Sequence, residues 1–297
     1  MSIEEPAGEK PTSAMKRAIR RLPLGRFGNR PPVVSVLRLS GVIGRMGSLR
    51  GGGLNLEGLE RLIARAFSPR GLKAVALAVN SPGGSPVQSA LIAGRIRALA
   101  DEKKIPVMAF AEDVAASGGY WLACAADEIY ADENSIVGSI GVISAGFGFP
   151  EAIARLGIER RVYSAGENKA MLDPFRPEDA DEVRRLKALQ GEIHESFKRH
   201  VRARRGERLN ETGESLFEGD FWTGTGAHRL GLIDGIGDLY SIMRARYGDS
   251  VKFRNFAPKS GGIRRLLGRG VDSAAYDRTT GIVAAVDEWS QWKRFGL

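Results

Sequence analysis

Residues Ala74–Val79 form an unbroken apolar run, AVALAV, with no polar position in it. A strand with one solvated face alternates apolar and polar residues, whereas a strand buried on both faces is apolar throughout. The run therefore predicts a central strand of a mostly parallel sheet that is covered by other elements on both sides. This feature favours the α/β class, in which helices cover both faces of the sheet.

The rest of the sequence alternates strand-like and helix-like patterns, as an α/β fold requires. Strands are predicted at 33–39, 73–79, 106–111, 128–131, 141–144 and 160–164. Helices are predicted at 54–67, 87–100, 118–125, 149–156, 177–205, 212–218, 223–231 and 238–247. We found no internal sequence repeat.

Charge is unevenly distributed along the 297 residues, whose net charge is +9. Residues 1–32 carry seven basic and three acidic side chains, and residues 258–297 carry seven and four. The body between them is close to neutral. We therefore expect a basic N-terminal segment at 1–32, one large domain at 33–257, and a basic linker and tail at 258–297.

The charge pattern also bears on partners. Nucleic-acid binding needs a basic face on the folded part, and only the run Lys198–Arg208 comes close, so no specific nucleic-acid site is expected. We expect this run to be the solvated end of a long helix. The basic tails favour contact with an anionic membrane surface. Trp289, Trp292 and Phe295 predict either an amphipathic C-terminal helix or docking on the chain's own core or on a sister subunit.

Location and cofactors are constrained by what the sequence lacks. It shows neither the apolar centre of a secretory signal nor a stretch long enough to span a membrane. We therefore expect a cytoplasmic protein that is peripheral to the inner membrane at most. Cys124 is the single cysteine, so an internal disulfide and a multi-cysteine zinc site are excluded. We expect neither a metal nor a cofactor.

The first motif with chemical meaning is N-S-P-G-G-S at 80–85, which lies between a buried strand and a helix. Two consecutive glycines remove the Cβ atoms that would block close approach to the backbone. An amide at Gly84 can then point into a cavity, as the oxyanion hole of an acyl-transfer enzyme requires. An ordinary tight turn is the alternative, because Pro-Gly-Gly is common in turns.

The second motif is A-A-S-G-G-Y at 115–120, which again follows a strand and begins a helix. A nucleophilic Ser117 at the start of that helix would lie near free backbone amides. The amide of Gly118 could join that of Gly84 in binding the oxyanion of a tetrahedral intermediate. The alternative is that Ser117 is a simple N-cap and that the glycines serve close packing.

A nucleophilic serine needs a base, and the three histidines are poorly placed to supply one. None lies between Ser117 and residue 193, and His194 and His200 are six positions apart, which excludes a metal-binding pair on one helix face. We expect them to be surface histidines. A desolvated lysine can replace histidine as the base. Lys169 follows a strand-like run and precedes three apolar residues, so it is either that base or an ordinary loop lysine.

Taken together, five motifs resemble the signal-peptide peptidase A, or protease IV, family of bacterial serine peptidases. They are N-S-P-G-G (80–84), A-S-G-G-Y (116–120), G-S-I-G-V (138–142), G-x-x-K (166–169) and W-T-G-x-x-A-x-x-x-G-L-I-D (222–234). The resemblance covers about three quarters of the chain. It implies a ClpP/crotonase-like α/β fold, a repeated ββα spiral with a helical C-terminal extension.

The resemblance also implies roles for individual residues. Ser117 would be the nucleophile and Lys169 the general base, with Gly84 and Gly118 as the oxyanion donors. Ser139 would orient the lysine amine. Members of this family assemble into homo-oligomers, often of eight when each chain has one repeat, so a homo-oligomer is expected here.

The function implied is a serine endopeptidase that cleaves apolar or unfolded peptides, such as signal peptides, through an acyl-enzyme. Two rival interpretations remain. A crotonase-type acyl-CoA enzyme uses a similar pair of backbone donors on a thioester oxygen, and a peptidase-like scaffold would bind proteins or membranes without cleaving them. The pairing of Ser117 with Lys169 favours the peptidase.

Overall fold

A computed structural model describes residues 31–44, 53–210, 215–258, 290 and 292–296. Its centre is an eight-stranded sheet in the order β6-β5-β3-β2-β1-β8, with β4 paired to β3 and β7. The strands are β1 (Val33–Ser40), β2 (Leu72–Ser81), β3 (Val107–Ala116), β4 (Glu128–Ala131), β5 (Ile136–Gly138), β6 (Phe221–Thr223), β7 (Gly235–Ile236) and β8 (Lys252–Phe256). All pairs are parallel except β5 with β6.

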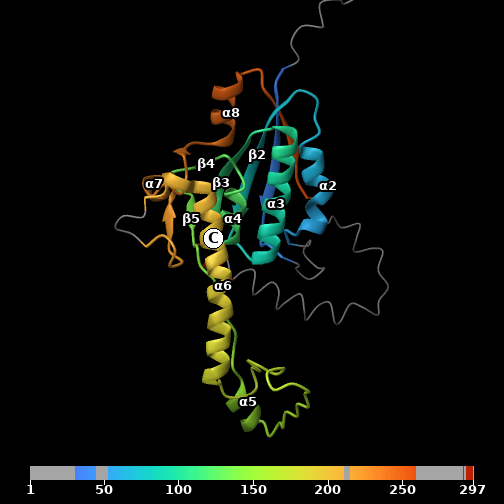
Figure 1. Ribbon diagram of the computed structural model, residues 1–297, viewed down its shortest axis with the longest axis vertical. Coiled ribbons are helices and arrows are strands. Elements are labelled where there is room, and N and C mark those ends of the chain that lie inside the picture. The colour runs from blue at the N-terminus through green and yellow to red at the C-terminus, as the bar shows by residue number, and fades with distance from the viewer. Residues whose placement is uncertain (1–30, 45–52, 211–214, 259–289, 291, 297) are drawn as a thin grey trace, which may run out of the picture.

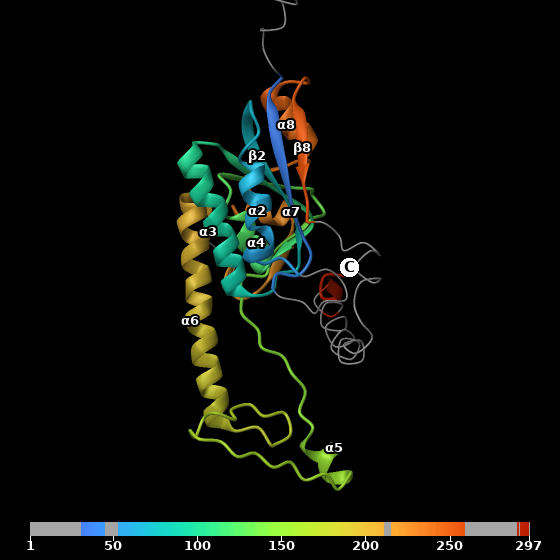
Figure 2. The same cartoon turned by 90° about the vertical axis from the view of Figure 1, so that its right-hand side faces the viewer.

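Helices cover the sheet and connect its strands (Figure 1). They are α2 (Leu56–Ala66), α3 (Pro86–Lys103), α4 (Gly118–Ala123), α5 (Pro150–Arg155), α6 (Ala180–Arg205), α7 (Gly224–Arg229) and α8 (Leu239–Tyr247). Figure 2 shows α2, α3, α4 and the upper half of α6 gathered on one side of the sheet, with α8 near β8 at its upper end.

The sheet is buried on both faces, as the apolar run at 74–79 predicted. Side chains alternate between the faces with a period of two. Leu77 and Val79 belong to the core under α2, α3 and α4. Ala76 and Met108 belong to a second core on the other face, together with residues of α8.

Polar side chains set where the helices begin. Asn55 accepts a hydrogen bond from the amide of Gly58 and so starts α2. Ser85 caps α3, whose first residue is a proline, and Asp179 accepts two backbone amides at the start of α6. Such N-caps satisfy amides that have no partner within the helix. The Ser85 cap fixes the start of α3 directly after the glycine turn at 83–84.

Residues 142–179, which we call the arm, depart from the prediction. The strands expected at 141–144 and 160–164 do not form there, and the only helix is α5. The arm and the lower half of α6 extend away from the body (Figures 1 and 2). The apolar pattern was misleading because a strand also needs an edge to pair with, and no sheet edge lies beside the arm.

Other departures are smaller. The part of the expected helix 212–218 that the structure describes, residues 215–218, contains a turn instead of a helix. The helices predicted at 223–231 and 238–247 form as α7 and α8, but β6, β7 and β8, which lie before, between and after them, were not predicted. The sequence of β8 is KFRNF, which contains no apolar run. The sequence therefore did not predict that β8 is a strand at the edge of the sheet, beside β1.

Most of the two basic tails, residues 1–30 and 259–289, lies outside the described residues. Of the C-terminal aromatics, Trp289 is also outside them, whereas Phe295 packs against Val114 and Ala116. Its ring meets that of Phe221 edge to face, with centroids 5.2 Å apart. Phe295 therefore docks on the chain's own sheet. Within the described ranges, no helix has both the length and the apolar character of a membrane span.

Candidate active site

Ser117, Ser139 and the glycine turn at 83–84 lie together at the carboxyl ends of β2, β3 and β5. Parallel strands end at the same edge of a sheet, and that edge is where α/β proteins bind ligands. The register is Ser81 opposite Ala115, and Ala116 opposite Gly138. Each site residue comes one to three positions after one of these pairs. The motifs at 80–85, 115–120 and 138–142 therefore meet in space although up to 62 residues separate them.

The backbone of Ser117 is strained. Its φ of 51° and ψ of −121° lie in a region that residues other than glycine rarely occupy. Such a conformation costs roughly 1–3 kcal/mol and persists only where the surroundings enforce it. The amide of Ser117 donates to the carbonyl oxygen of Gly138 at 2.8 Å, and its own carbonyl accepts from Trp121. The hydroxyl makes no capping bond to α4, so the simple N-cap interpretation is wrong.

The glycine turn fits tightly against residue 43. Ile43 donates to the carbonyl of Gly83 at 2.7 Å and accepts from the amide of Ser85 at 2.8 Å. Gly84 has a φ of +137°, and a Cβ there would lie 2.0 Å from the Ile43 oxygen. Only glycine fits this position. Ile43 was not singled out from the sequence, because nothing in its neighbourhood signals an isolated bridge.

The amides of Gly84 and Gly118 are neighbours. A Cβ built on Gly118 would lie 3.4 Å from the Gly84 nitrogen and 2.5 Å from Oγ of Ser89. As the first residue of α4, Gly118 has an amide with no partner inside the helix. Two adjacent backbone donors beside a serine hydroxyl are the arrangement that stabilises a tetrahedral oxyanion.

Ser139 lies beside Ser117 in the structure. It is buried, with a φ of 52°, and its amide donates to the carbonyl of Asp220. Among the described residues, the structure shows no hydrogen bond to Ser117 Oγ or to Ser139 Oγ. Both hydroxyls are therefore available to other groups.

A small pocket of about 20 Å³ lies at Ser117. Trp121 of α4, Ile193 and Phe197 of α6, and Val142 form its apolar wall. The rings of Trp121 and Phe197 stack with centroids 4.8 Å apart. The contribution of α6 was not predicted, because its residues come about 80 positions after the serine in the sequence. A larger hollow of about 550 Å³ between β3 and α8 does not include Ser117.

Lys169 does not line the pocket at Ser117. It is exposed and lies in a turn of the arm, between α5 and α6. The arm extends away from the body (Figures 1 and 2). Its amide donates to Gly166 within the same turn. The arm is joined to the first turn of α6 through Arg176 and Leu172, both of which bond to the carboxylate of Glu182. The apolar neighbours of Lys169 do not enclose it within this single chain.

The two histidines on α6 are half-buried, not fully exposed as the sequence-based expectation implied. His200 stacks on Trp121 with ring centroids 4.7 Å apart, and its Nε2 lies 3.2 Å from the Trp121 oxygen. Burial lowers the pKa of His200. His194 Nε2 lies 3.1 Å from the carbonyl oxygen of Ile140. Neither ring is bonded to Ser117. His228 lies exposed on α7.

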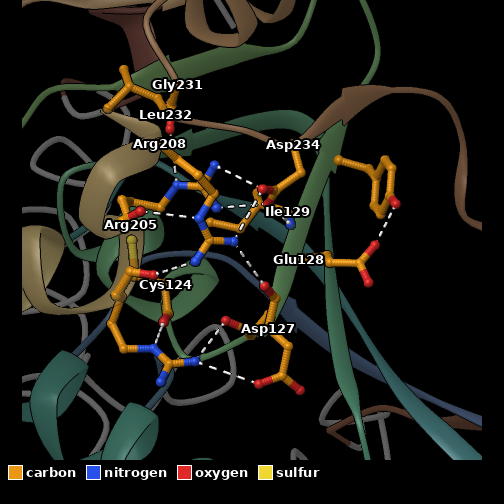
Figure 3. A network of polar contacts seen from close by, with 12 residues as sticks. Cys124, Asp127, Glu128, Ile129, Arg205, Arg208, Gly231, Leu232 and Asp234 are labelled. Carbon is orange, nitrogen blue, oxygen red and sulfur yellow. Dashed lines mark hydrogen bonds and ion pairs between the residues drawn. The ribbon is translucent and has the colours of Figure 1, made fainter. Parts of the chain in front are cut away.

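The run Lys198–Arg208 is only partly a solvated helix end: Arg199, Arg202 and Arg208 are exposed, whereas Arg204 is half-buried and Arg205 is buried. Arg204 donates to the carbonyls of Cys124 and Ala126, and Arg205 donates to Gly231 and to the carboxylate of Asp234 (Figure 3). These arginines point inward because buried carbonyls and a carboxylate lie under this end of α6. The same burial raises the pKa of Cys124 to about 12, which excludes a thiolate nucleophile there.

Comparisons with known proteins agree with this geometry. The model of peptidase family S49 matches residues 99–247, which is half of the chain and includes Ser117, Ser139 and Lys169. The chain belongs to peptidase family S49. The family was thus recognised correctly from the five motifs.

Relatives of this S49 chain carry several names. A serine protease SPPA of Arabidopsis thaliana chloroplasts is 32% identical over 74% of the chain, which corresponds to 33% of that protein. A Na⁺/H⁺ antiporter NhaA of Brucella melitensis biotype 1 is 47% identical over 96% of the chain, which corresponds to 40% of that protein. The S49 chain therefore spans well under half of each of these relatives.

A solved structure confirms the fold. The 1510-N membrane-bound stomatin-specific protease superposes with a TM-score of 0.50 at 17% identity, over 78% of this S49 chain and all of that one. The chain thus has the ClpP/crotonase-like α/β fold that its motifs implied.

Proposed function

We propose that this S49 chain is a serine endopeptidase in which Ser117 is the nucleophile. One observation carries the proposal: the strained Ser117 lies beside the paired amides of Gly84 and Gly118. Strain at a serine that follows a strand and begins a helix is typical of nucleophiles that must face a substrate. The two amides would bind the oxyanion that forms when Ser117 attacks a carbonyl carbon.

Lys169 is the proposed general base. As a neutral amine it would take the proton of the Ser117 hydroxyl while Oγ bonds to the carbonyl carbon of the peptide. The resulting ammonium would give that proton to the leaving amine as the peptide C–N bond breaks. Water would then hydrolyse the acyl-enzyme by the same proton transfers. Ser139, which follows Gly138 opposite the residue before Ser117, would hydrogen-bond the amine and orient it.

We further propose that Lys169 acts on Ser117 of a second copy of this chain. The arm that carries Lys169 exposes a large amount of apolar surface, which an isolated chain would leave in water. Its exposed apolar side chains are Ile143, Phe147, Phe149, Leu156, Ile158, Val162, Tyr163 and Leu172. Burial of this surface against a neighbouring subunit would supply the desolvation that a neutral lysine needs. This supports the expected homo-oligomer.

Apolar or unfolded peptides are the proposed substrates, signal peptides among them. The wall of the pocket beside Ser117 is made of Trp121, Ile193, Phe197 and Val142, so it offers no charge to a substrate side chain. At about 20 Å³ the hollow itself holds no more than about one water, so the proposal rests on the apolar character of its wall, which favours apolar groups next to the cleaved bond.

A crotonase-type acyl-CoA enzyme is the alternative function. It would use the same pair of amides without acylating Ser117.

Contact with an anionic membrane remains a separate proposal. The basic tails that motivate it lie mostly outside the described residues, and a homologous segment occurs in a longer protein named as an antiporter. Vesicles that contain anionic lipid should bind the chain at low salt and release it at high salt. Equal binding to neutral vesicles would reject an electrostatic contact.

Covalent labelling with a fluorophosphonate tests the proposed function. The wild type should be labelled at Ser117, and Ser117→Ala should not be labelled. Ser68→Ala, which removes an exposed hydroxyl at the end of α2, is the matched control and should react like the wild type. Labelling that survives in Ser117→Ala, or a wild type that never reacts, would contradict the nucleophile. Lys169→Arg should lose peptide cleavage, because arginine does not deprotonate in proteins.

A further inference from the structure

Helix α4 begins directly after Ser117 and ends in a cluster of buried backbone carbonyls. All six of its residues, Gly118–Ala123, are buried. The last carbonyls of a helix have no partner inside it, and leaving them unpaired in a protein interior is costly. The carbonyls of Tyr120, Leu122 and Ala123 accept from the backbone amides of residues 124–126. The carbonyl of Trp121, and those of the three residues that follow α4, take side-chain donors from elsewhere in the chain.

Side chains of α6 and α3 supply those donors. His200 Nε2 lies 3.2 Å from the Trp121 oxygen. Arg204 donates through Nε to Cys124 and through Nη2 to Ala126, both at 2.8 Å. Arg97 of α3 donates to Ala125 at 3.1 Å. A carbonyl can only accept, so Nε2 of His200 carries the hydrogen.

The donors on α6 are themselves held in place. Arg205 is 2% exposed and donates to both oxygens of Asp234. Arg208 donates to Asp234, to the Asp127 carbonyl and to the carbonyl of Arg204 (Figure 3). These bonds fix the C-terminal end of α6 to the body, while its other end carries the arm.

We propose that Arg204 and His200 are positioning residues for Ser117, and that they act through α4. The inference rests on the proposed function of Ser117. A helix of six residues is only about 9 Å long, so a shift at its carbonyl end is passed on to its first residue. Without the two α6 side chains, α4 relaxes to satisfy its carbonyls, and Ser117 leaves its strained backbone conformation for that of an ordinary N-cap. Its hydroxyl then bonds to α4 instead of facing a substrate.

Four variants of the full-length chain test this inference. Arg204→Lys keeps the charge but loses the planar guanidinium, whose separate N–H groups donate to two carbonyls. His200→Phe keeps an aromatic ring on Trp121 and loses the donor. Arg199→Lys, an exposed change on the same helix, is the matched control. Arg246→Lys weakens the ion pair of α8 with Glu128 on β4 and touches neither α4 nor α6.

The measured quantities are the rate constant of fluorophosphonate acylation at Ser117, kcat and KM for a peptide, and the midpoint of urea unfolding. Arg204→Lys and His200→Phe should each slow acylation and lower kcat about tenfold or more, with KM little changed, because a displaced nucleophile loses its alignment. Arg246→Lys should lower the urea midpoint while its acylation rate stays close to that of Arg199→Lys.

The outcomes separate the inference from the proposed function. A wild type that is not acylated at Ser117 contradicts the proposed function itself. If the wild type reacts and both α6 variants react as fast as Arg199→Lys, the positioning role is wrong. It is also wrong if acylation falls in step with the urea midpoint in all variants, because that is the behaviour of a purely structural network. Acylation is measured far below each variant's urea midpoint, so loss of folding does not obscure the comparison.

Discussion

Replacing Asp234 with asparagine should destabilise the protein strongly. Asp234 accepts from Arg205 at 2.6 and 3.1 Å and from the amide of Ile129 at 2.7 Å (Figure 3). In Asp234→Asn, the 2% exposed guanidinium of Arg205 remains buried without a counter-charge. Breaking a buried ion pair in this way costs about 3–5 kcal/mol.

The expected size can be stated for a thermal transition. A domain of about 200 residues loses about 2–4 °C in Tm per kcal/mol, so Tm should fall by about 6–20 °C. Calorimetry and urea unfolding of the two proteins would measure the difference. Asp249→Asn, an exposed aspartate on the same domain, is the matched control and should change Tm little.

The difference in stability between the wild type and Asp234→Asn should become smaller at low pH. Burial raises the pKa of Asp234, but the hydrogen bonds from Arg205 and Ile129 and the charges of Arg205 and Arg208 outweigh it, so the net pKa is lowered. A carboxylate whose pKa is depressed on folding adds stability above its unfolded pKa of about 3.9, and this stability is lost as pH falls through the folded value. The gap between wild type and Asp234→Asn should therefore be constant from pH 8 to 5 and should narrow below pH 4.

Two results would refute this reasoning. A loss of less than about 1 kcal/mol in Asp234→Asn would mean that Arg205 finds other partners, as an exposed ion pair would allow. If the difference in unfolding free energy between the wild type and Asp234→Asn is the same at pH 3 as at pH 7, the carboxylate is not the source of the stability. Adding Arg205→Met to Asp234→Asn should recover part of the loss, since a well-packed apolar side chain leaves no buried charge.

Three further predictions concern the turn, the core and the arm. Gly84→Ala should slow acylation at Ser117 about 100-fold or more, because its Cβ would lie 2.0 Å from a backbone oxygen; Gly94→Ala, in open space on α3, is the control. Tyr120→Phe should lose about 1–3 kcal/mol in urea unfolding, because its buried hydroxyl donates to the Leu232 carbonyl at 2.7 Å. Phe147→Asp, at a side chain that is 80% exposed, should lower the sedimentation coefficient and peptide cleavage together; an unchanged coefficient would count against the oligomer.

The central sheet could be predicted from the sequence because its signals are local. The runs at 33–39, 73–79 and 128–131 became β1, β2 and β4 almost unchanged. Each combines β-branched or other apolar residues over strand length, and in β2 the apolar run at 74–79 matches burial on both faces. Helices α3 and α8 were found from the same kind of pattern. Their caps, at Ser85 and Asp238, are polar residues directly before the apolar period begins.

The positions of four candidate site residues could also be predicted from local sequence signals. Ser117, Ser139, Gly84 and Gly118 each lie just after a strand, and parallel strands bring their ends together. The position of Lys169 did not follow, because the arm has no sheet edge beside it. The bonds of Arg204 to Cys124 and Ala126 did not follow either, since they join residues about 80 positions apart and their acceptors are backbone atoms that no side-chain pattern marks.

Subunit mixing tests the central claim most directly, namely that Ser117 and Lys169 from different copies form the active site. Ser117→Ala and Lys169→Ala should each be inactive alone. If the pair crosses between copies, random mixing after mild dissociation and reassembly should restore activity at about a quarter of the sites, because an intact serine can then meet an intact lysine. Mixtures that stay inactive, although labelled subunits are shown to exchange, would contradict the claim.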